Sequence, residues 1–149
     1  MDAMDWALLR ELQADARLSY SELSRRVHLS PPAVAERVRR LEETGVITGY
    51  RAHVDLAKTG REVLALIRMS CYGPSCVLRD PSVAGWPEIL EIHRVTGDTC
   101  SLLKVAAASM DAFESVIDRL AAYGQPSSTM ILSTPLGWQA ITPNGVPES

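Results

Sequence analysis

Two short runs of periodically spaced apolar residues, each with its own helix-start signal, lie in quick succession between residues 19 and 45. The first opens with SYSE at residues 19–22, which fits the capping box S-x-x-E. The second opens with Ser30-Pro31, an N-cap residue followed by a proline near the first helical position. Only residues 28–30 separate the two runs, and adjacent prolines are incompatible with one continuous helix. The segment therefore predicts two helices joined by a tight turn.

A further helix is expected before this pair and a strand after it. Residues 6–12 supply an apolar side for the first helix, with Asp5 as its expected N-cap. The last helix is expected to run to about Thr44, because Gly45 suits the position just beyond a helix end. The following residues 46–55 (VITGYRAHVD) are typical of a strand leaving this unit.

The apolar pattern changes from Val63 onward to one typical of strands. Strands are expected at residues 63–70, 89–95, 101–107 and 128–134, with a turn at residues 96–98 between the middle two. A weak helical stretch over residues 75–85 is interrupted by Asp80-Pro81, and Ser109 caps a clear helix that ends before Gly124. The order β-α-β-β-α-β is the ferredoxin-like split motif. The predicted fold class is α+β, with domains at 1–53 and 62–149 and a linker at 54–61.

The charge of the chain is unevenly distributed. The net charge is −3, but residues 17–51 hold seven arginines against four glutamates, a local charge of +3. A local basic face is what binds a polyanion. No apolar run approaches the roughly 20 residues needed to span a bilayer. The N-terminal residues are acidic where a secretory signal is basic, so a cytoplasmic location without membrane contact is expected.

The helix that begins at Pro31 carries the main functional prediction. With Val34, Val38 and Leu41 turned inward, a step of about 100° per residue places the polar side chains outward. This is the helix-turn-helix arrangement, in which the first turns of the second helix read DNA bases. The predicted base-reading residues are Ser30, Pro32, Ala33 and Glu36, and the predicted phosphate-binding residues are Arg37, Arg39, Arg40, Arg25 and Arg26.

A solvated helix face is the competing interpretation of the same arginines. Glu36–Arg40 and Arg39–Glu43 have the i,i+4 spacing of helical ion pairs. If Arg40 binds a phosphate, Arg40→Ala should lower the salt slope of DNA binding by about one unit. An unchanged slope would make Arg40 a pair partner of Glu36.

The three cysteines predict neither a closed disulfide set nor a metal site. Cys71, Cys76 and Cys100 are an odd number, and no C-x2-C pair is present. Small buried or half-buried thiols are the expected state. No cofactor is expected, and no nucleophile with a supporting base is recognisable.

Residues 4–55 resemble the N-terminal helix-turn-helix of the Lrp/AsnC family of feast/famine transcription regulators. LSPPAVAERVRRLEETGVITGY is the most diagnostic segment, and VTGDTCSLLKV resembles the central turn of the family's C-terminal domain. The resemblance implies double-stranded DNA as partner and an effector, usually an amino acid, bound by a ferredoxin-like domain. It also implies homodimers, which often assemble into octamers of four dimers. Within this frame residues 1–53 form a winged-type DNA-binding domain and residues 62–149 a ligand-sensing and dimerisation domain.

The implied effector site departs from the family pattern. The family commonly has Gly-Asp-aromatic-Asp in the loop where this chain has Gly97, Asp98, Thr99 and Cys100. A thiol does not replace the charge-assisted hydrogen bonds of a carboxylate. Three outcomes stay open: altered specificity, use of Asp98 or backbone groups, or loss of the site.

Two other functions compete with an effector-modulated regulator. One is an architectural DNA-binding protein that has kept the fold without the ligand site. The other is an enzyme resembling the sirohaem decarboxylases of this fold. Only His93 and Arg94 support this alternative. The expectation is therefore a regulator and not an enzyme.

Overall fold

The computed structural model of the chain describes residues 1–143 and divides into two compact units. One unit is Met1–Ala52 together with residues 136–143, and the other is His53–Pro135. Each unit has its own hydrophobic core. The predicted domain at 62–149 includes residues 136–143, which group with the first unit, and residues 144–149, which lie outside the described part of the chain. Backbone N–H and C=O of Ile141 bond the side-chain amide of Gln13, at 2.8 and 3.0 Å.

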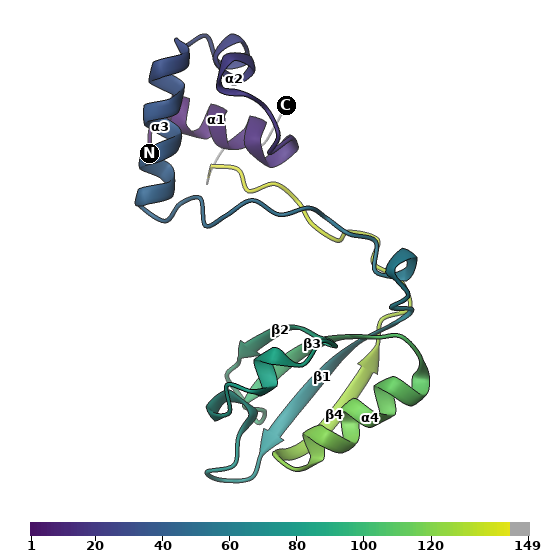
Figure 1. The fold of residues 1–149 in the computed structure, drawn as a ribbon. Helices are drawn as coiled ribbons and strands as arrows, with labels where there is room; N and C mark the ends of the chain where they lie inside the picture. Colours follow the sequence, from purple (N-terminus) through teal and green to yellow (C-terminus); the bar gives the residue numbers. More distant parts are fainter. Residues whose placement is uncertain (144–149) are drawn as a thin grey trace. The chain divides into compact units, whose positions relative to one another are not determined.

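Three helices make up the first unit: α1 (Ala3–Ala14), α2 (Tyr20–Val27) and α3 (Pro31–Glu43) (Figure 1). The N-caps of α2 and α3 are Ser19 and Ser30, as predicted. The N-cap of α1 is Asp2 rather than the predicted Asp5, because Asp5 closes a capping box with Asp2 from inside the first turn.

The end of α3 follows the prediction closely. Gly45 adopts φ 72°, a left-handed conformation that glycine takes without a steric penalty. The N–H groups of Gly45 and Val46 bond the carbonyls of Glu42 and Leu41, which satisfies groups that the helix end leaves free. Val34, Val38 and Leu41 are all buried, as the periodicity predicted.

A four-stranded antiparallel sheet with one long helix forms the second unit. The strands are β1 (Val63–Cys71), β2 (Ile89–Arg94), β3 (Ser101–Ala107) and β4 (Gly124–Met130), and the helix is α4 (Met110–Ala121). The sheet order β2-β3-β1-β4 is the ferredoxin-like arrangement (Figure 1). The predicted α+β fold class is confirmed.

Three predicted elements differ from the structure. Residues 46–55 form no strand, since no neighbouring strand pairs with them. The weak helix over residues 75–85 is two 3-10 turns, Val77–Arg79 and Val83–Gly85, because Asp80-Pro81 ends the first of them. The last strand begins at Gly124 rather than at residue 128, since β4 follows the pairing offered by the edge of β1.

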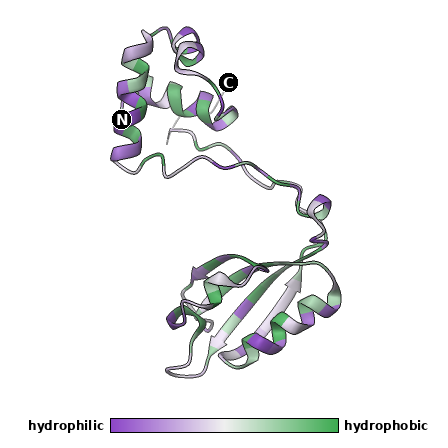
Figure 2. Ribbon diagram, in the orientation of Figure 1, coloured by the Kyte–Doolittle hydropathy of each residue, from purple (hydrophilic) through white to green (hydrophobic). Residues whose placement is uncertain are grey.

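The sheet has one covered face and one open face. Ala65, Ile67 and Met69 of β1 point into the core with Phe113 and Leu120 of α4. The alternate residues of β1 and β3 point the other way, where no helix of the unit lies (Figures 1 and 2). They are half-buried or exposed apart from Ala106, and include Leu64, Leu66, Arg68, Leu102 and Lys104. No helix among residues 1–143 has the length and apolar character needed to cross a membrane.

Candidate nucleic-acid interface and effector loop

The first turn of α3 is presented to solvent. Ser30, Pro32 and Glu36 are exposed and Ala33 is half-buried. Pro31 and Pro32 fix the backbone direction at the start of the helix, and the Ser30 hydroxyl accepts a hydrogen bond from the Ala33 N–H at 3.4 Å. The predicted base-reading residues therefore form one accessible surface at a capped helix end.

The arginines near this surface differ in their ion pairs. Arg39 pairs with Glu43 and Glu36 along α3, and Arg26 pairs with Glu11 of α1 and Glu22 of α2. The Arg39 hydrogen bonds lower the pKa of the Glu36 carboxyl. Arg25 is exposed and makes no ion pair with any residue between 1 and 143.

The carboxylate of Asp5 in α1 binds the two remaining arginines of α3, Arg37 and Arg40. Its carboxylate accepts hydrogen bonds from Arg37 at 2.7 Å and from Arg40 at 3.0 Å. Arg37 also bonds Asp2 at 2.7 Å. The competing interpretation paired Arg40 with Glu36, whereas Arg40 pairs with Asp5, because the α1–α3 packing places this buried carboxylate within reach.

The Asp5 carboxylate is charged although it is buried. Its side chain is 2% exposed, and this burial by itself raises its pKa. Hydrogen bonds from the Asp2 N–H and Arg37, together with the charge of Arg40, outweigh the burial and leave the pKa lowered from 3.8. The sequence did not predict this contact, since the residues are 32 and 35 positions apart.

The predicted effector loop joins β2 to β3. Gly97 adopts φ 106°, a conformation that favours glycine, and Asp98 is exposed. The Cys100 N–H bonds the carbonyl of Met69 at 2.8 Å. The Cys100 side chain is directed into the unit toward Met69 and the other two cysteines. The thiol therefore does not occupy an outward position in the loop.

The three cysteines were expected to be separate thiols, but they lie close together in the structure. The expected burial is confirmed: Cys76 is buried, and Cys71 and Cys100 are half-buried. Their clustering was not predicted, because the sequence separations of 5 and 29 residues give no local signal.

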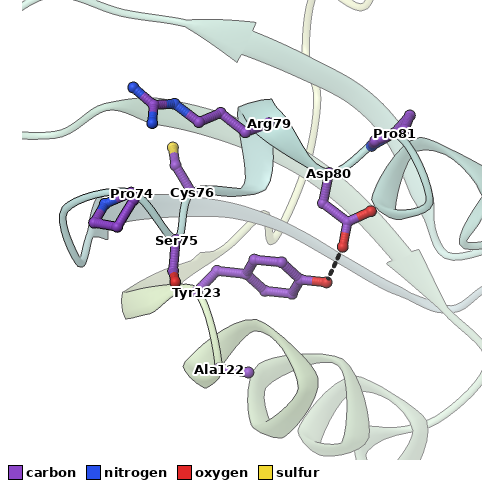
Figure 3. A pocket seen from close by; sticks show the side chains of 8 residues that line it. All are labelled: Pro74, Ser75, Cys76, Arg79, Asp80, Pro81, Ala122 and Tyr123. Atoms are coloured by element: carbon purple, nitrogen blue, oxygen red, sulfur yellow. Dashed lines mark hydrogen bonds between the residues drawn. The ribbon is translucent and has the colours of Figure 1, made fainter.

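An open hollow of about 350 Å³ lies between the segment from Pro74 to Pro81 and the end of α4. Figure 3 shows Tyr123 reaching across it to Asp80, and the hydrogen bond between them is 2.7 Å long. Hydrogen bonds from Ser82 and, second, from Tyr123 lower the pKa of the Asp80 carboxyl. The same bond raises the pKa of Tyr123. The hollow contains none of the predicted effector residues.

His93 and Arg94 do not converge on a common cavity. Adjacent residues of a strand point to opposite faces of the sheet. His93 contacts Glu91 at 2.9 Å, and Glu91 in turn pairs with Lys104 at 3.1 Å. These contacts explain His93 as part of a polar row on the open face.

Comparison with known proteins decides the family. The family model of the AsnC-type helix-turn-helix domain matches residues 1–42, and that of the Lrp/AsnC ligand binding domain matches residues 81–137. The chain belongs to the Lrp/AsnC family. The uncharacterized HTH-type transcriptional regulator YezC of Bacillus subtilis is 39% identical over 134 residues, which cover 90% of this chain and 95% of YezC.

Solved structures of Lrp/AsnC proteins share the fold along the chain. LrpC of B. subtilis has a TM-score of 0.87 at 33% identity, with 93% of this chain and 99% of that chain covered. A feast or famine regulatory protein from M. tuberculosis, complexed with L-methionine, has a TM-score of 0.88 at 34% identity, with 95% and 99% covered. This member of the Lrp/AsnC family is a helix-turn-helix transcriptional regulator.

Proposed function

We propose that the chain binds operator DNA through α3 and that a small effector bound to the C-terminal unit modulates this binding. The single observation that carries the DNA contact is the capped start of α3, where Ser30, Pro32, Ala33 and Glu36 of the first two turns share one accessible surface. Such a helix end enters the major groove in helix-turn-helix proteins.

The arginines divide into two roles under this proposal. Arg25 is free to meet a phosphate, and Arg39 can exchange exposed carboxylates for phosphates, whereas one carboxylate that Arg26 would release, that of Glu11, is only 18% exposed. Arg37 and Arg40 pair with Asp5 and so hold α1 against α3. Arg40 also reaches the surface, because 54% of its side chain is exposed. Affinity then comes from phosphate contacts, while the first turn of α3 supplies sequence discrimination.

A salt titration of DNA binding tests the phosphate contacts. Selection of bound fragments from genomic DNA first gives an operator. Arg25→Ala and Arg40→Ala should each weaken binding to operator and to unrelated DNA alike, and lower the salt slope by about one unit. Arg10→Ala removes the same charge from α1 and is the matched control, expected to leave the slope unchanged. Equal slopes for all four proteins would contradict the phosphate role.

Glu36→Ala tests the base-reading surface separately. Because Glu36 lies on the first turns of α3, its loss should change the preferred base at one operator position, with a discrimination of about 1–3 kcal/mol. Binding to selected sequence libraries measures this preference. An unchanged preference would assign Glu36 to its ion pair with Arg39 alone.

An amino acid is the proposed effector, bound near Gly97, Asp98 and Thr99. Support comes from the similar M. tuberculosis regulator complexed with L-methionine, and from the exposed Asp98 carboxylate in the matching loop. Calorimetry with a panel of amino acids, followed by operator binding at saturating effector, tests this. No heat and no change in operator affinity would favour the architectural alternative.

The open face of the sheet is the proposed dimer surface. Leu64, Leu66 and Leu102 stand on it beside the polar row of His93 and Lys104. An apolar strip with a polar border is typical of interfaces between copies. We place the resulting dimer, which can assemble further to an octamer, in the cytoplasm with the chromosome. A role in binding rather than catalysis fits relatives that are named regulators.

A further inference from the structure

The cysteine cluster is defined by the sulfur atoms of Cys71, Cys76 and Cys100, all of which lie within 4.8 Å of one another. Cys71 is in bonding contact with both Cys76 and Cys100. The Sγ atoms of Cys76 and Cys100 are 3.6 Å apart. A sulfur atom joins only one partner in a disulfide, so one disulfide would leave a third thiol against the pair. Coordination of a central ion uses all three sulfur atoms together.

The spacing of the cluster suits a metal ion. Thiolates bind Zn²⁺ at about 2.3 Å, so three of them around one ion stand roughly 4 Å apart. The 3.6 Å separation of Cys76 and Cys100 is close to this value. Cys71 lies closer than this to both other sulfur atoms, so its side chain must move away from them to complete the triangle.

Ordered backbone holds each of the three ligands. Cys71 ends β1, where it pairs with Gly124 of β4. The N–H of Cys100 bonds the carbonyl of Met69 at 2.8 Å, and the carbonyl of Cys76 accepts a bond of 2.8 Å from the Arg79 N–H. Ligands on fixed elements lose little freedom when an ion binds.

A buried hydroxyl lies beside the cluster, and one of the three cysteines lines the hollow. Ser101 is fully buried, and its hydroxyl lies 3.6 Å from the Cys100 sulfur with no other hydrogen-bond partner in residues 1–143. A hydroxyl in this position can donate to a metal-bound thiolate, as the outer partners of metal ligands commonly do. The Cys76 side chain points away from the Tyr123 ring but also lines the hollow, so the cluster borders the hollow (Figure 3).

We propose that Cys71, Cys76 and Cys100 bind one thiophilic d10 metal ion, Cu(I) or Zn(II), through three thiolates. Soft thiolates select these ions. Within residues 1–143 the cluster includes no His, Asp or Glu ligand. Cu(I) is satisfied by three sulfur ligands, whereas Zn(II) takes a fourth ligand from solvent or effector. The thiols release their protons as the ion binds.

Two of the three proposed ligands lie in or beside the effector loop. Cys100 is the last residue of that loop, and Cys71 ends the strand beside it. An ion joining the two would fix the loop and change the space open to an effector. This regulatory consequence rests on the proposed function, while binding of the ion does not.

Metal uptake by the full chain tests the proposal. The protein is purified anaerobically with reductant, freed of metal with a chelator, and titrated with Cu(I) against a chromophoric Cu(I) chelator and with Zn(II) against a zinc indicator. Cd(II) serves as a third probe through its ultraviolet thiolate charge-transfer band. We expect one ion to bind per chain. The affinities from the two titrations show whether the site prefers Cu(I) or Zn(II).

Single substitutions assign the ligands. Cys71→Ser, Cys76→Ser and Cys100→Ser should each weaken binding by more than about 100-fold, beyond the loss typical of an outer-partner change. Ser75→Ala, adjacent to Cys76, is the matched control and should bind as the unaltered chain does. Thermal unfolding of each variant checks its fold. If a serine variant unfolds, the Cd(II) band and the thiol count of the unaltered chain carry the test.

Three results would overturn the proposal: no uptake of any of the three ions by the reduced chain, uptake that survives all three substitutions, or a single reactive thiol that persists under reductant. Operator binding with and without ion separates the two proposals. Metal uptake without DNA binding would refute the proposed function alone, and DNA binding without metal uptake would refute the metal site alone.

Discussion

Asp5 joins two helices of the N-terminal unit. One buried carboxylate caps the start of α1 together with Asp2 and binds Arg37 and Arg40 of α3. Because these bonds orient the helix that carries the proposed base-reading surface, they connect the stability of the unit to its function.

Asp5→Ala should lower the free energy of unfolding by about 2 kcal/mol, since it removes hydrogen bonds from two charged partners and the N–H of Asp2. Thermal or urea unfolding of the full chain measures the loss. Asp118→Ala, an exposed aspartate of α4, is the control and should stay within about 0.5 kcal/mol of the unaltered chain. Equal losses in the two variants would show that the Asp5 contacts add no stability.

The stability contributed by Asp5 should also depend on pH in a defined direction. Its pKa is lowered on folding from the ordinary 3.8, so the contribution is complete above 3.8 and disappears as the pH falls through the lower folded value. The melting temperature of Asp5→Asn should therefore lie below that of the unaltered chain at neutral pH and approach it in acid. A gap that widens in acid would have the wrong sign.

At the scale of elements, pairing with β1 determines where the edge strand β4 begins. Its first residues, Gly124, Gln125 and Pro126, have little strand propensity, yet they pair with the end of β1. A Cβ at Gly124 would overlap the Ser70 carbonyl oxygen and lie 2.8 Å from the Cys71 Cα. Close approach of two backbones therefore requires glycine here.

Gly124→Ala should lower the free energy of unfolding of the C-terminal unit by about 1–3 kcal/mol, because β4 must move away from β1. Faster amide hydrogen exchange at residues 124, 125 and 127 than in β3 would locate the effect. Gly85→Ala is the matched control, since a Cβ there meets no atom within 4 Å. Similar behaviour of both variants would exclude the steric explanation.

At the scale of the whole molecule, the open face of the sheet is the proposed dimer surface. Leu66 lies at the centre of this face, between Lys104 of β3 and Thr129 of β4. A single chain leaves this leucine only half-buried. Burial of such apolar area is the main driving force for association of copies.

Leu66→Asp should shift the chain from dimer to monomer, because a carboxylate would be buried without a partner in the interface. Sedimentation velocity over a concentration series measures the change. Ser115→Asp adds the same charge on the exposed side of α4 and should leave the association unchanged. A monomeric unaltered chain would refute the proposed interface.

Local signals in the sequence determined most of the elements. The caps at Ser19 and Ser30, the turn at Gly45 and the buried set of Val34, Val38 and Leu41 were all predicted, because helix caps and helical periodicity involve residues a few positions apart. The order of strands likewise followed from alternation and turn residues, and the family resemblance was confirmed over the length of the chain.

Only the tertiary structure decided which distant residues meet. The Asp5–Arg37 contact, the cysteine cluster, the start of β4 at Gly124 and the bonds between Gln13 and Ile141 all join positions that local patterns do not relate. Each depends on the path of the chain between its members, and that path is fixed by packing of the two cores. The sequence by itself thus determined the helix proposed to read DNA, and the fold decided what holds that helix and what surrounds Cys100.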